Sequence, residues 1–332
     1  MTALTVETRR FALREAFVIS RGSRTHVETV EVHLSDGVHV GRGECVPYKR
    51  YGETVEGVVA EIRAQTQAIA RGLDREGLQS ALPAGAARNA LDLAFWDLAA
   101  KRAEIRVWEL PAYRALGGAP PAPVVSAFTL SIGAPEAMRE AARKNAHRPI
   151  LKVKLAGEAT DIERMKAVRD GAPDARLVVD ANEGWSADGY GASAQAMADL
   201  GVEMIEQPIH ADEDDALAAL PRPVALCADE ACHDRATLDR LAGKYDVVNI
   251  KLDKTGGLTE ALALRAEARA RGFEVMIGCM MSSSLGIAPA VLLGDGAALV
   301  DLDPPMLLGE DREPPLAVDG ATVMPPVRDL WG

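Results

Sequence analysis

Apolar and polar positions follow two different patterns along the chain. Residues 29–47 alternate around Ser35-Asp36-Gly37, which predicts a β-hairpin, because alternation of period two is typical of strands with one buried face. The stretches 53–73 and 84–104 carry apolar residues at helical spacing and predict two amphipathic helices. A sheet followed by helices indicates an α+β unit in the first third of the chain.

The pattern changes beyond a Gly- and Pro-rich segment at 115–125, which predicts a domain boundary. We expect an N-terminal α+β capping domain over 1–118. A second domain is expected over 119–332, with its C-terminal segment returning to the cap.

Short apolar runs then recur, each followed by an Ala-rich helical stretch. The eight runs lie at 125–133, 149–157, 176–182, 202–208, 223–230, 246–253, 273–281 and 297–303. Near-continuous apolar strands that alternate with helices predict a parallel sheet covered on both faces, and eight strands are the number that closes a (β/α)₈ barrel. An open doubly wound sheet is the alternative, but no GxGxxG follows its first strand. The α/β barrel is therefore the predicted fold class.

Composition excludes several classes of function. The chain has 332 residues, with 37 Lys and Arg against 49 Asp and Glu, and a formal net charge of −12, which argues against a nucleic-acid or membrane partner. Its four cysteines show no paired CxxC spacing and predict neither a disulfide framework nor a zinc site. No apolar run approaches the roughly 20 residues of a membrane span, and no signal-peptide pattern opens the chain. We therefore expect a cytoplasmic protein.

Charged residues end five successive runs of the predicted barrel. In order they are Lys152 and Lys154, Asp180, Glu206, Asp229 and Lys251. Active sites of such barrels form at the C-terminal strand ends, so the three carboxylates should converge there, with lysines on opposite sides. Three oxygen ligands without His or Cys suit Mg²⁺, whereas zinc would require imidazole or thiolate.

These residue types suit proton transfer next to a carboxylate. Removal of such a proton places a second negative charge on the substrate, and Mg²⁺ held by the three acids can neutralise it. A lysine base requires a lowered pKa, which the metal and the Lys152 ammonium would produce. Lys154 and Lys251 on opposite faces of one carbon would remove a proton on one side and return one on the other, which inverts a stereocentre.

The strand-end motifs resemble those of the muconate-lactonizing subgroup of the enolase superfamily. They read LKVKLAG, VVDANEGW, MIEQP, CADE and NIKLDKTGGL, in the family's order, and the resemblance covers essentially the whole chain. It implies a modified, enolase-like (β/α)₈ barrel and a bound Mg²⁺. Residue by residue, it implies Asp180, Glu206 and Asp229 as metal ligands, Lys154 and Lys251 as the acid/base pair, and Lys152 and Glu230 as catalytic support, with Glu230 orienting Lys251.

The eighth run carries a further resemblance. Asp301-Leu-Asp303 resembles the DxD of dipeptide epimerases, in which two carboxylates hold the substrate's α-ammonium, as a cation requires. The stretches from Phe17 through 43–53, and later 83–100, resemble the L-Ala-D/L-Glu epimerases of murein peptide recycling.

This closer resemblance implies several substrate contacts. A loop arginine would pair with the Glu side chain, and we place this role on Arg24, with Arg21 as the alternative. Thr129 matches a position that touches substrate, and Cys279 and Met280 would line the pocket of the reacting side chain.

The predicted function is Mg²⁺-dependent epimerisation of the C-terminal residue of a dipeptide, from L-Ala-L-Glu to L-Ala-D-Glu and back. The two lysines would exchange the α-proton through an enediolate. Three alternatives are an epimerase of another dipeptide set, a cycloisomerase or o-succinylbenzoate synthase, and a catalytically silent Mg²⁺-binding barrel. The only partner expected is a small-molecule substrate, and a homo-oligomer is compatible with the pattern.

Overall fold

The computed structural model describes residues 1–332. The N-terminal unit contains an antiparallel sheet in the order β1 (Ala3–Ile19), β2 (Gly22–Ser35) and β3 (Val40–Cys45). Strands β2 and β3 form the predicted hairpin. Strand β1 was not predicted, because it lies at the sheet edge and its exposed charges interrupt the apolar alternation.

Four helices follow this sheet. They are α1 (Val55–Ala64), α2 (Thr66–Ala70), α3 (Arg75–Ala81) and α4 (Ala86–Ala103). The helix predicted over 53–73 is divided at Gln65, and the helix predicted over 84–104 is confirmed as α4. A 3-10 turn at Val107–Glu109 and helix α5 (Pro111–Ala115) lead to the second unit.

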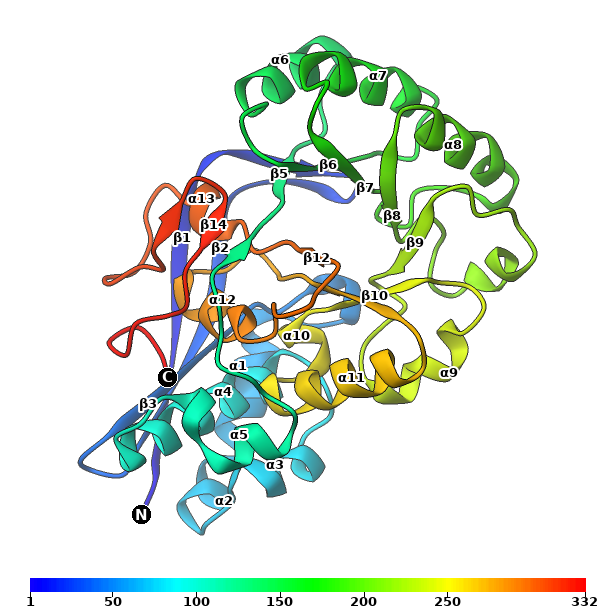
Figure 1. Cartoon of the computed structure of the whole chain (residues 1–332). Coiled ribbons are helices and arrows are strands. Elements are labelled where there is room, and N and C mark those ends of the chain that lie inside the picture. Colours follow the sequence, from blue (N-terminus) through cyan, green and yellow to red (C-terminus); the bar gives the residue numbers. More distant parts are fainter.

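The second unit contains the predicted eight-stranded parallel sheet. Its strands are β5 (Phe128–Leu130), β6 (Ile150–Lys154), β7 (Arg176–Asp180), β8 (Val202–Glu206), β9 (Ala225–Ala228), β10 (Val247–Ile250), β11 (Glu274–Ile277) and β12 (Leu299–Val300). Each strand pairs with its neighbours in sequence order, so the sheet curls as the barrel prediction requires (Figure 1). At the seam, Ala127 N donates to Val300 O over 2.8 Å.

The connections between strands are unequal, which makes this a modified barrel. Long helices follow several strands: α6 (Pro135–Lys144), α7 (Asp161–Gly171), α8 (Ala187–Asp199), α11 (Leu258–Ala270) and α12 (Ser284–Val291). Short turns follow others, among them α9 (Leu238–Leu241), α10 (Leu252–Thr255) and α13 (Pro304–Leu307). None of these helices combines the length and hydropathy that a membrane crossing requires.

A small sheet and the chain end bring the two units together. Strands β13 (Val318–Asp319), β14 (Thr322–Val323) and β4 (Val124–Val125) form a second antiparallel sheet. Beyond it, Trp331 is fully buried, and its Nε1 donates to Arg42 O over 3.1 Å and to Leu93 O over 3.3 Å. The C-terminal segment therefore lies against β3 and α4, while the domain boundary at residue 118 stays a prediction.

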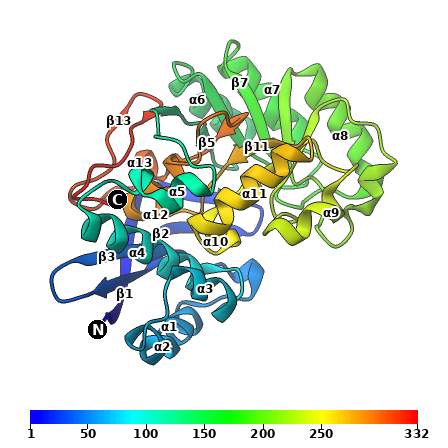
Figure 2. The ribbon, with the colours of Figure 1, turned by 60° about the horizontal axis from the view of Figure 1, so that its bottom comes forward.

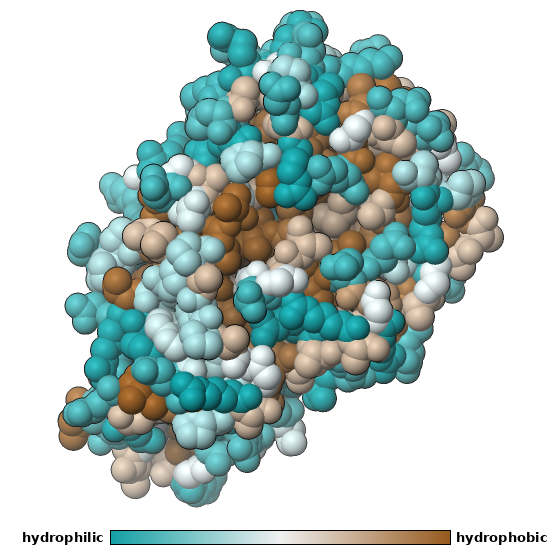
Figure 3. All heavy atoms as spheres, viewed as in Figure 1, coloured by the Kyte–Doolittle hydropathy of each residue, from teal (hydrophilic) through white to brown (hydrophobic).

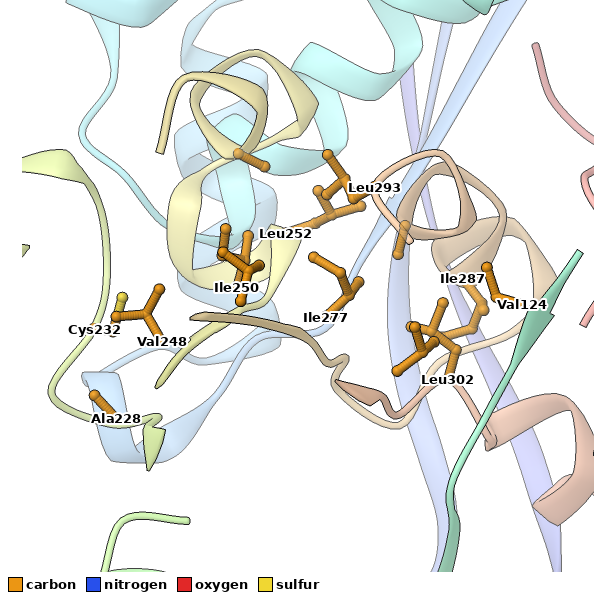
Figure 4. Close-up of a cluster of buried hydrophobic side chains, with 14 of the residues drawn as sticks. Val124, Ala228, Cys232, Val248, Ile250, Leu252, Ile277, Ile287, Leu293 and Leu302 are labelled. Carbon is orange, nitrogen blue, oxygen red and sulfur yellow. The ribbon is translucent and has the colours of Figure 1, made fainter. Parts of the chain in front are cut away.

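One apolar core continues from the barrel into the N-terminal unit. Side chains of β10, β11 and α12 pack together between the sheet and the outer helices (Figure 4). Leu93 and Trp96 of α4 belong to the same cluster. On the face shown in Figure 3, apolar surface gathers near the centre and polar side chains cover most of the periphery. Helix α4 lies beside strand β3 of the N-terminal unit (Figure 2) and also contributes side chains to the core of the barrel.

Strand β3 packs directly on α4 through its glycines. A Cβ on Gly43 would lie 2.1 Å from Ala90 O and 2.8 Å from Ala94 N. Both obstacles are backbone atoms of a buried helix, so they cannot move aside as a flexible side chain can. This contact requires glycine.

We expect Gly43→Ala to lower the free energy of unfolding by about 1–3 kcal/mol, because an overpacked interface must separate. Gly191→Ala, in the exposed part of α8 with open space around it, is the matched control and should be neutral or slightly stabilising. Urea unfolding followed by circular dichroism measures both. Equal stability of the two variants would contradict the packing argument.

Candidate active site

A cavity opens at the C-terminal ends of the barrel strands, beneath the β1–β2 hairpin. It brings together ten of the residues predicted from sequence: Arg24, Thr129, Lys152, Lys154, Asp229, Lys251, Cys279, Met280, Asp301 and Asp303. The hairpin reaches this position through the bond from Ile132 N to Val18 O, 3.0 Å long. Arg21, Tyr48 and Asn182 also line the cavity. The parallel register of the sheet thus gathers side chains that are far apart in sequence.

The three predicted metal ligands stand on adjacent strand ends. Asp180 ends β7, Glu206 ends β8, and Asp229 follows β9. All three side chains are buried. In-register pairing aligns Asp180 with Lys154 on one side and with Glu206 on the other. The carboxylates thus occupy neighbouring strand ends at the mouth of the barrel, and their role as metal ligands stays a prediction.

Four lysine ammonium groups balance these carboxylates. Lys152 Nζ lies 2.5 Å from Glu206 Oε2, and Lys154 Nζ lies 2.5 Å from Asp180 Oδ2. On the other side, Lys251 Nζ lies 2.7 Å from Asp229 Oδ2. Lys254, which the sequence interpretation missed, contributes the fourth ammonium at 2.7 Å from Asp229 Oδ1.

The pKa shifts follow from this balance. Burial would raise the pKa of Asp180 and of Asp229, but the adjacent lysines outweigh it and hold both pKa values below their ordinary range. Burial would lower the pKa of Lys251, but attraction to Asp229 and Glu206 keeps that pKa above its usual value. The Lys152 ammonium lowers the pKa of Lys251, in the direction that the sequence suggested, but the two carboxylates have the larger effect. Among protein groups alone, Lys251 is therefore a stabilised cation.

The donor set suits a hard divalent cation. All three side chains present only oxygen, and Glu206 Oε2 is buried without a directed hydrogen bond although Lys152 lies close to it. Burial, with a further contribution from the neighbouring Asp180, raises the pKa of Glu206, so a bound cation would stabilise the charged form of this carboxylate. No three His, Cys, Asp or Glu side chains are already gathered around one point, because each carboxylate is turned toward a lysine. The residues present fit Mg²⁺ by their chemistry.

A second pair of acids occupies the opposite wall of the cavity. Asp301 Oδ2 lies 2.7 Å from Lys152 Nζ, and its Oδ1 is buried without a partner. Asp303 Oδ2 accepts from Thr129 N over 2.7 Å. Burial, with a further contribution from Asp301, raises the pKa of Asp303 to about 7. These two carboxylates therefore have capacity for an added cation.

The two hairpin arginines have different surroundings. Arg21 donates to Tyr48 Oη over 2.9 Å, to Glu230 Oε1 over 2.7 Å and to Asn182 O over 3.2 Å. Arg24 stacks on the Tyr48 ring, 5.6 Å from its centroid, and lies at the cavity wall. Glu230 was expected to orient Lys251, but the hydrogen bond it accepts comes from Arg21. Arg21 thus closes the cavity and Arg24 faces it.

Several supporting residues had no distinct signal in the sequence. Asn249 Nδ2 donates to Glu206 Oε1 over 2.8 Å, and Gln207 Oε1 accepts from Asp229 N over 2.9 Å. Glu183 forms a two-point contact with Arg50, with both N–O distances at 2.7 Å. Among the residues that the sequence analysis missed, Lys254 is the one with a signal in the sequence: it is a second lysine three residues after Lys251, about one helical turn away.

Comparison with known proteins places the chain in a family. Residues 1–111 match the mandelate racemase / muconate lactonizing enzyme, N-terminal domain, and residues 136–325 match the enolase C-terminal domain-like family. The L-Ala-D/L-Glu epimerase of Escherichia coli K12 is 48% identical over 95% of this chain and 97% of its own length. The N-acetyl-D-glutamate racemase of a Pseudoalteromonas species is 41% identical over 91% of this chain and 95% of its own.

Solved structures agree with this placement. An enolase family member from Agrobacterium tumefaciens, with homology to dipeptide epimerases and with bound sodium and L-Ala-L-Glu, superposes with a TM-score of 0.96 at 48% identity, covering all of both chains. A dipeptide epimerase from Enterococcus faecalis, in complex with Mg and L-Leu-L-Tyr, superposes with a TM-score of 0.88 at 29% identity over 98% of this chain and 96% of its own. With both of its units matched, the chain belongs to the mandelate racemase / muconate lactonizing enzyme family of the enolase superfamily.

Proposed function

We propose that this protein is a Mg²⁺-dependent dipeptide epimerase that interconverts L-Ala-L-Glu and L-Ala-D-Glu. The observation that carries the proposal is the pair of lysines in one cavity: Lys154 extends from β6 and Lys251 from the end of β10. These strands are four positions apart in an eight-stranded sheet, so the two ammonium groups approach a bound substrate from opposite sides. The relative from Escherichia coli supports the same activity.

Asp180, Glu206 and Asp229 would hold the Mg²⁺. When bound, the ion supplies a Lewis acid for the charge that develops on the substrate's terminal carboxylate. Asn249 and Gln207 hold Glu206 and the Asp229 backbone in place. Lys152, fully buried between Glu206 and Asp301, keeps its charge and attracts the substrate carboxylate.

Lys154 and Lys251 would move the α-proton. One lysine accepts the proton from its face of the α-carbon, and the other, already an ammonium, donates a proton to the opposite face. The α-carbon is thereby inverted while each lysine changes its protonation state once. We further propose that the enzyme acts in the cytoplasm, in the metabolism of murein peptides.

In D₂O, Lys154→Ala and Lys251→Ala should each lower epimerisation of L-Ala-L-Glu by at least about a hundredfold, because a proton-transfer group contributes that much. Each variant should keep α-proton exchange with one epimer only, since the remaining lysine still serves one face. Mass spectrometry and chiral chromatography measure exchange and inversion, and EDTA should stop both.

Lys166→Ala, on the exposed side of α7, is the control and should behave as the unmodified enzyme. Normal inversion by either site variant would disprove the two-base proposal. Exchange of neither epimer by the unmodified enzyme would disprove the activity itself.

Asp301 and Asp303 would bind the substrate's α-ammonium. A free amino terminus is a cation, and a pair of buried carboxylates gives it charge-assisted hydrogen bonds. Substrates with an acylated amino group carry no such cation. Racemisation of an N-acetylated amino acid is a second candidate activity, because one relative is an N-acetyl-D-glutamate racemase. The buried, unpartnered Oδ1 of Asp301 favours a dipeptide with a free amino group.

We expect Asp303→Asn to lower kcat/KM for L-Ala-L-Glu by roughly tenfold to a hundredfold, the usual range for a lost charge-assisted hydrogen bond. Turnover of N-acetyl-L-glutamate, if present, should be little changed. Because the pKa of Asp303 is raised to about 7, the carboxylate is neutral below that pH and charged above it.

The dipeptide kcat/KM of the unmodified enzyme should therefore rise as the pH increases from 6 to 7, and this rise should be absent in Asp303→Asn. Steady-state kinetics across this pH range measure the effect. Equal losses for the dipeptide and the acetylated substrate would show that Asp303 does not bind the ammonium.

Arg24 would bind the carboxylate of the second residue's side chain. It lines the cavity beside Tyr48, whereas Arg21 is already bonded to Glu230. An arginine at the cavity wall suits planar carboxylate recognition. This assigns the Glu preference to the hairpin of the N-terminal unit.

Arg24→Gln should lower kcat/KM for L-Ala-L-Glu by roughly tenfold to a hundredfold, because a charged hydrogen bond is lost. It should leave L-Ala-L-Gln nearly unaffected, since the amide carries no charge. Arg14→Gln is the matched control, because Arg14 lies on the neighbouring strand β1 of the same hairpin, exposed and outside the cavity. Comparable losses on both dipeptides would indicate a general change of the hairpin.

A further inference from the structure

We propose that Asp253 is a positioning residue that fixes the base Lys251 against helix α4 of the N-terminal unit. The inference extends the proposed function, which makes Lys251 an acid/base group. It starts from the short helix α10, which begins directly after this lysine.

The backbone of Lys251 depends on α10. Lys251 has an extended backbone, with φ −121° and ψ 131°. Its carbonyl oxygen accepts hydrogen bonds from Lys254 N and Thr255 N, each 3.0 Å long. Any shift of this single turn therefore moves the residue that carries the base. A turn of four residues has little stability of its own, so its position must come from tertiary contacts.

Asp253 supplies a contact to the N-terminal unit. Its Oδ1 accepts from Val46 N, at the end of β3, over 2.9 Å, and from Asn89 Nδ2, on α4, also over 2.9 Å. The carboxylate thus joins two elements of the cap to the turn that carries Lys251. The mechanism proposed above gives Asp253 no chemical role.

Helix α4 continues along the same segment beyond Asp253. Arg88 donates to Thr255 O over 2.7 Å and to Gly256 O over 3.1 Å. Gly256 has φ +71°, and a Cβ there would lie 2.5 Å from Arg88 Nε. This positive φ and the close approach of Arg88 on α4 explain why the first glycine of the NIKLDKTGGL motif is a glycine.

The next residues repeat the arrangement. Asp92 accepts from Thr259 N over 3.0 Å. Gly257 has φ +115°, and a Cβ on it would lie 2.5 Å from Asp92 Cβ. Two stretches that resemble the family, 83–100 and NIKLDKTGGL, are therefore the two sides of one interface, and that interface ends at Lys251.

The other side of α10 faces the reaction. Lys254 Nζ bonds Asp229 Oδ1 over 2.7 Å and Asn249 O over 2.9 Å, while Leu252 packs beside Ile250 in the core (Figure 4). Without Asp253, the turn keeps these contacts and the Arg88 bonds at its C-terminal end, but it loses the two hydrogen bonds to the cap that lie nearest to Lys251. A displacement of about 1 Å at a reacting group can cost a hundredfold in rate.

The test measures α-proton exchange of each epimer separately in D₂O. Lys251→Ala first identifies the epimer whose proton Lys251 removes. Asp253→Ala should then lower exchange of that epimer about tenfold to a hundredfold and leave exchange of the other within about threefold. Asp253→Asn, which keeps an acceptor oxygen for Val46 N and Asn89, should restore the rate to within about threefold of the unmodified enzyme.

Asp97→Ala is the matched control. Asp97 is a fully buried acid on α4, the helix that Asp253 contacts, and it accepts from Arg42 N and Gly332 N, away from α10. A purely structural loss at the cap should affect both epimers alike, as expected for this control. Equal effects of Asp253→Ala on the two epimers would overturn the inference.

A second variant and a second readout keep the test decisive. If Asp253→Ala does not fold, Asn89→Ala removes the donor from the other side and should show the same asymmetry. A crystal structure of the variant should show the Lys251–Asp229 pair opened beyond 2.7 Å and the Lys152–Asp301 pair unchanged. This result does not depend on the substrate, so an unchanged Lys251 refutes the positioning role, whereas absent exchange in the unmodified enzyme refutes the proposed function.

Discussion

The balance of buried charge at the mouth of the barrel constrains the rest of this structure. Asp180, Glu206 and Asp229 lie on neighbouring strand ends with their side chains buried, and each is paired with an ammonium group. Removal of one partner from a buried ion pair typically costs about 3–5 kcal/mol, because the other charge is left uncompensated. The lysines therefore stabilise the folded mouth of the barrel, in addition to the acid/base role proposed for Lys154 and Lys251. A divalent cation and the proposed dipeptide would enter this balance together, since the dipeptide carries two carboxylates and one ammonium and offsets part of the cation's charge.

The N-terminal unit completes the barrel rather than covering it from outside. Helix α4 shares the main apolar core, and Trp331 at the chain end packs on it. Near the cavity, Arg50 and Glu183 link the segment after β3 to the loop after β7. The parts of the cap beside the cavity are thus held by polar contacts, and the parts around α4 are held by apolar burial. This division permits the hairpin to vary in sequence while the core stays intact.

The features that could be predicted from the sequence are those that depend on hydrophobic periodicity and on the residues at strand ends. The eight runs, the order of the strands and the gathering of lysines and acids follow from local patterns, and the structure has all of them. Strand β1 was not found, because an exposed edge strand lacks a buried face to pattern. Asn249 and Gln207 were missed for another reason: the sequence around an amide side chain in an apolar run does not indicate which group it will hydrogen-bond. The partner of Glu230 was also unpredictable, since Arg21 is 209 residues away.

Arg21 and Arg24 show why residue type alone does not assign a role. Both belong to the tip of the same hairpin, and both stack on Tyr48. Arg21 meets Glu230 and the carbonyl of Asn182, so its charge is used in holding the hairpin against the barrel. Arg24, three residues further on, faces the cavity with its charge available to a ligand. Under the proposed function, the strand ends of the barrel would determine which proton moves and the hairpin would determine which side chain is admitted, so the two properties could change independently.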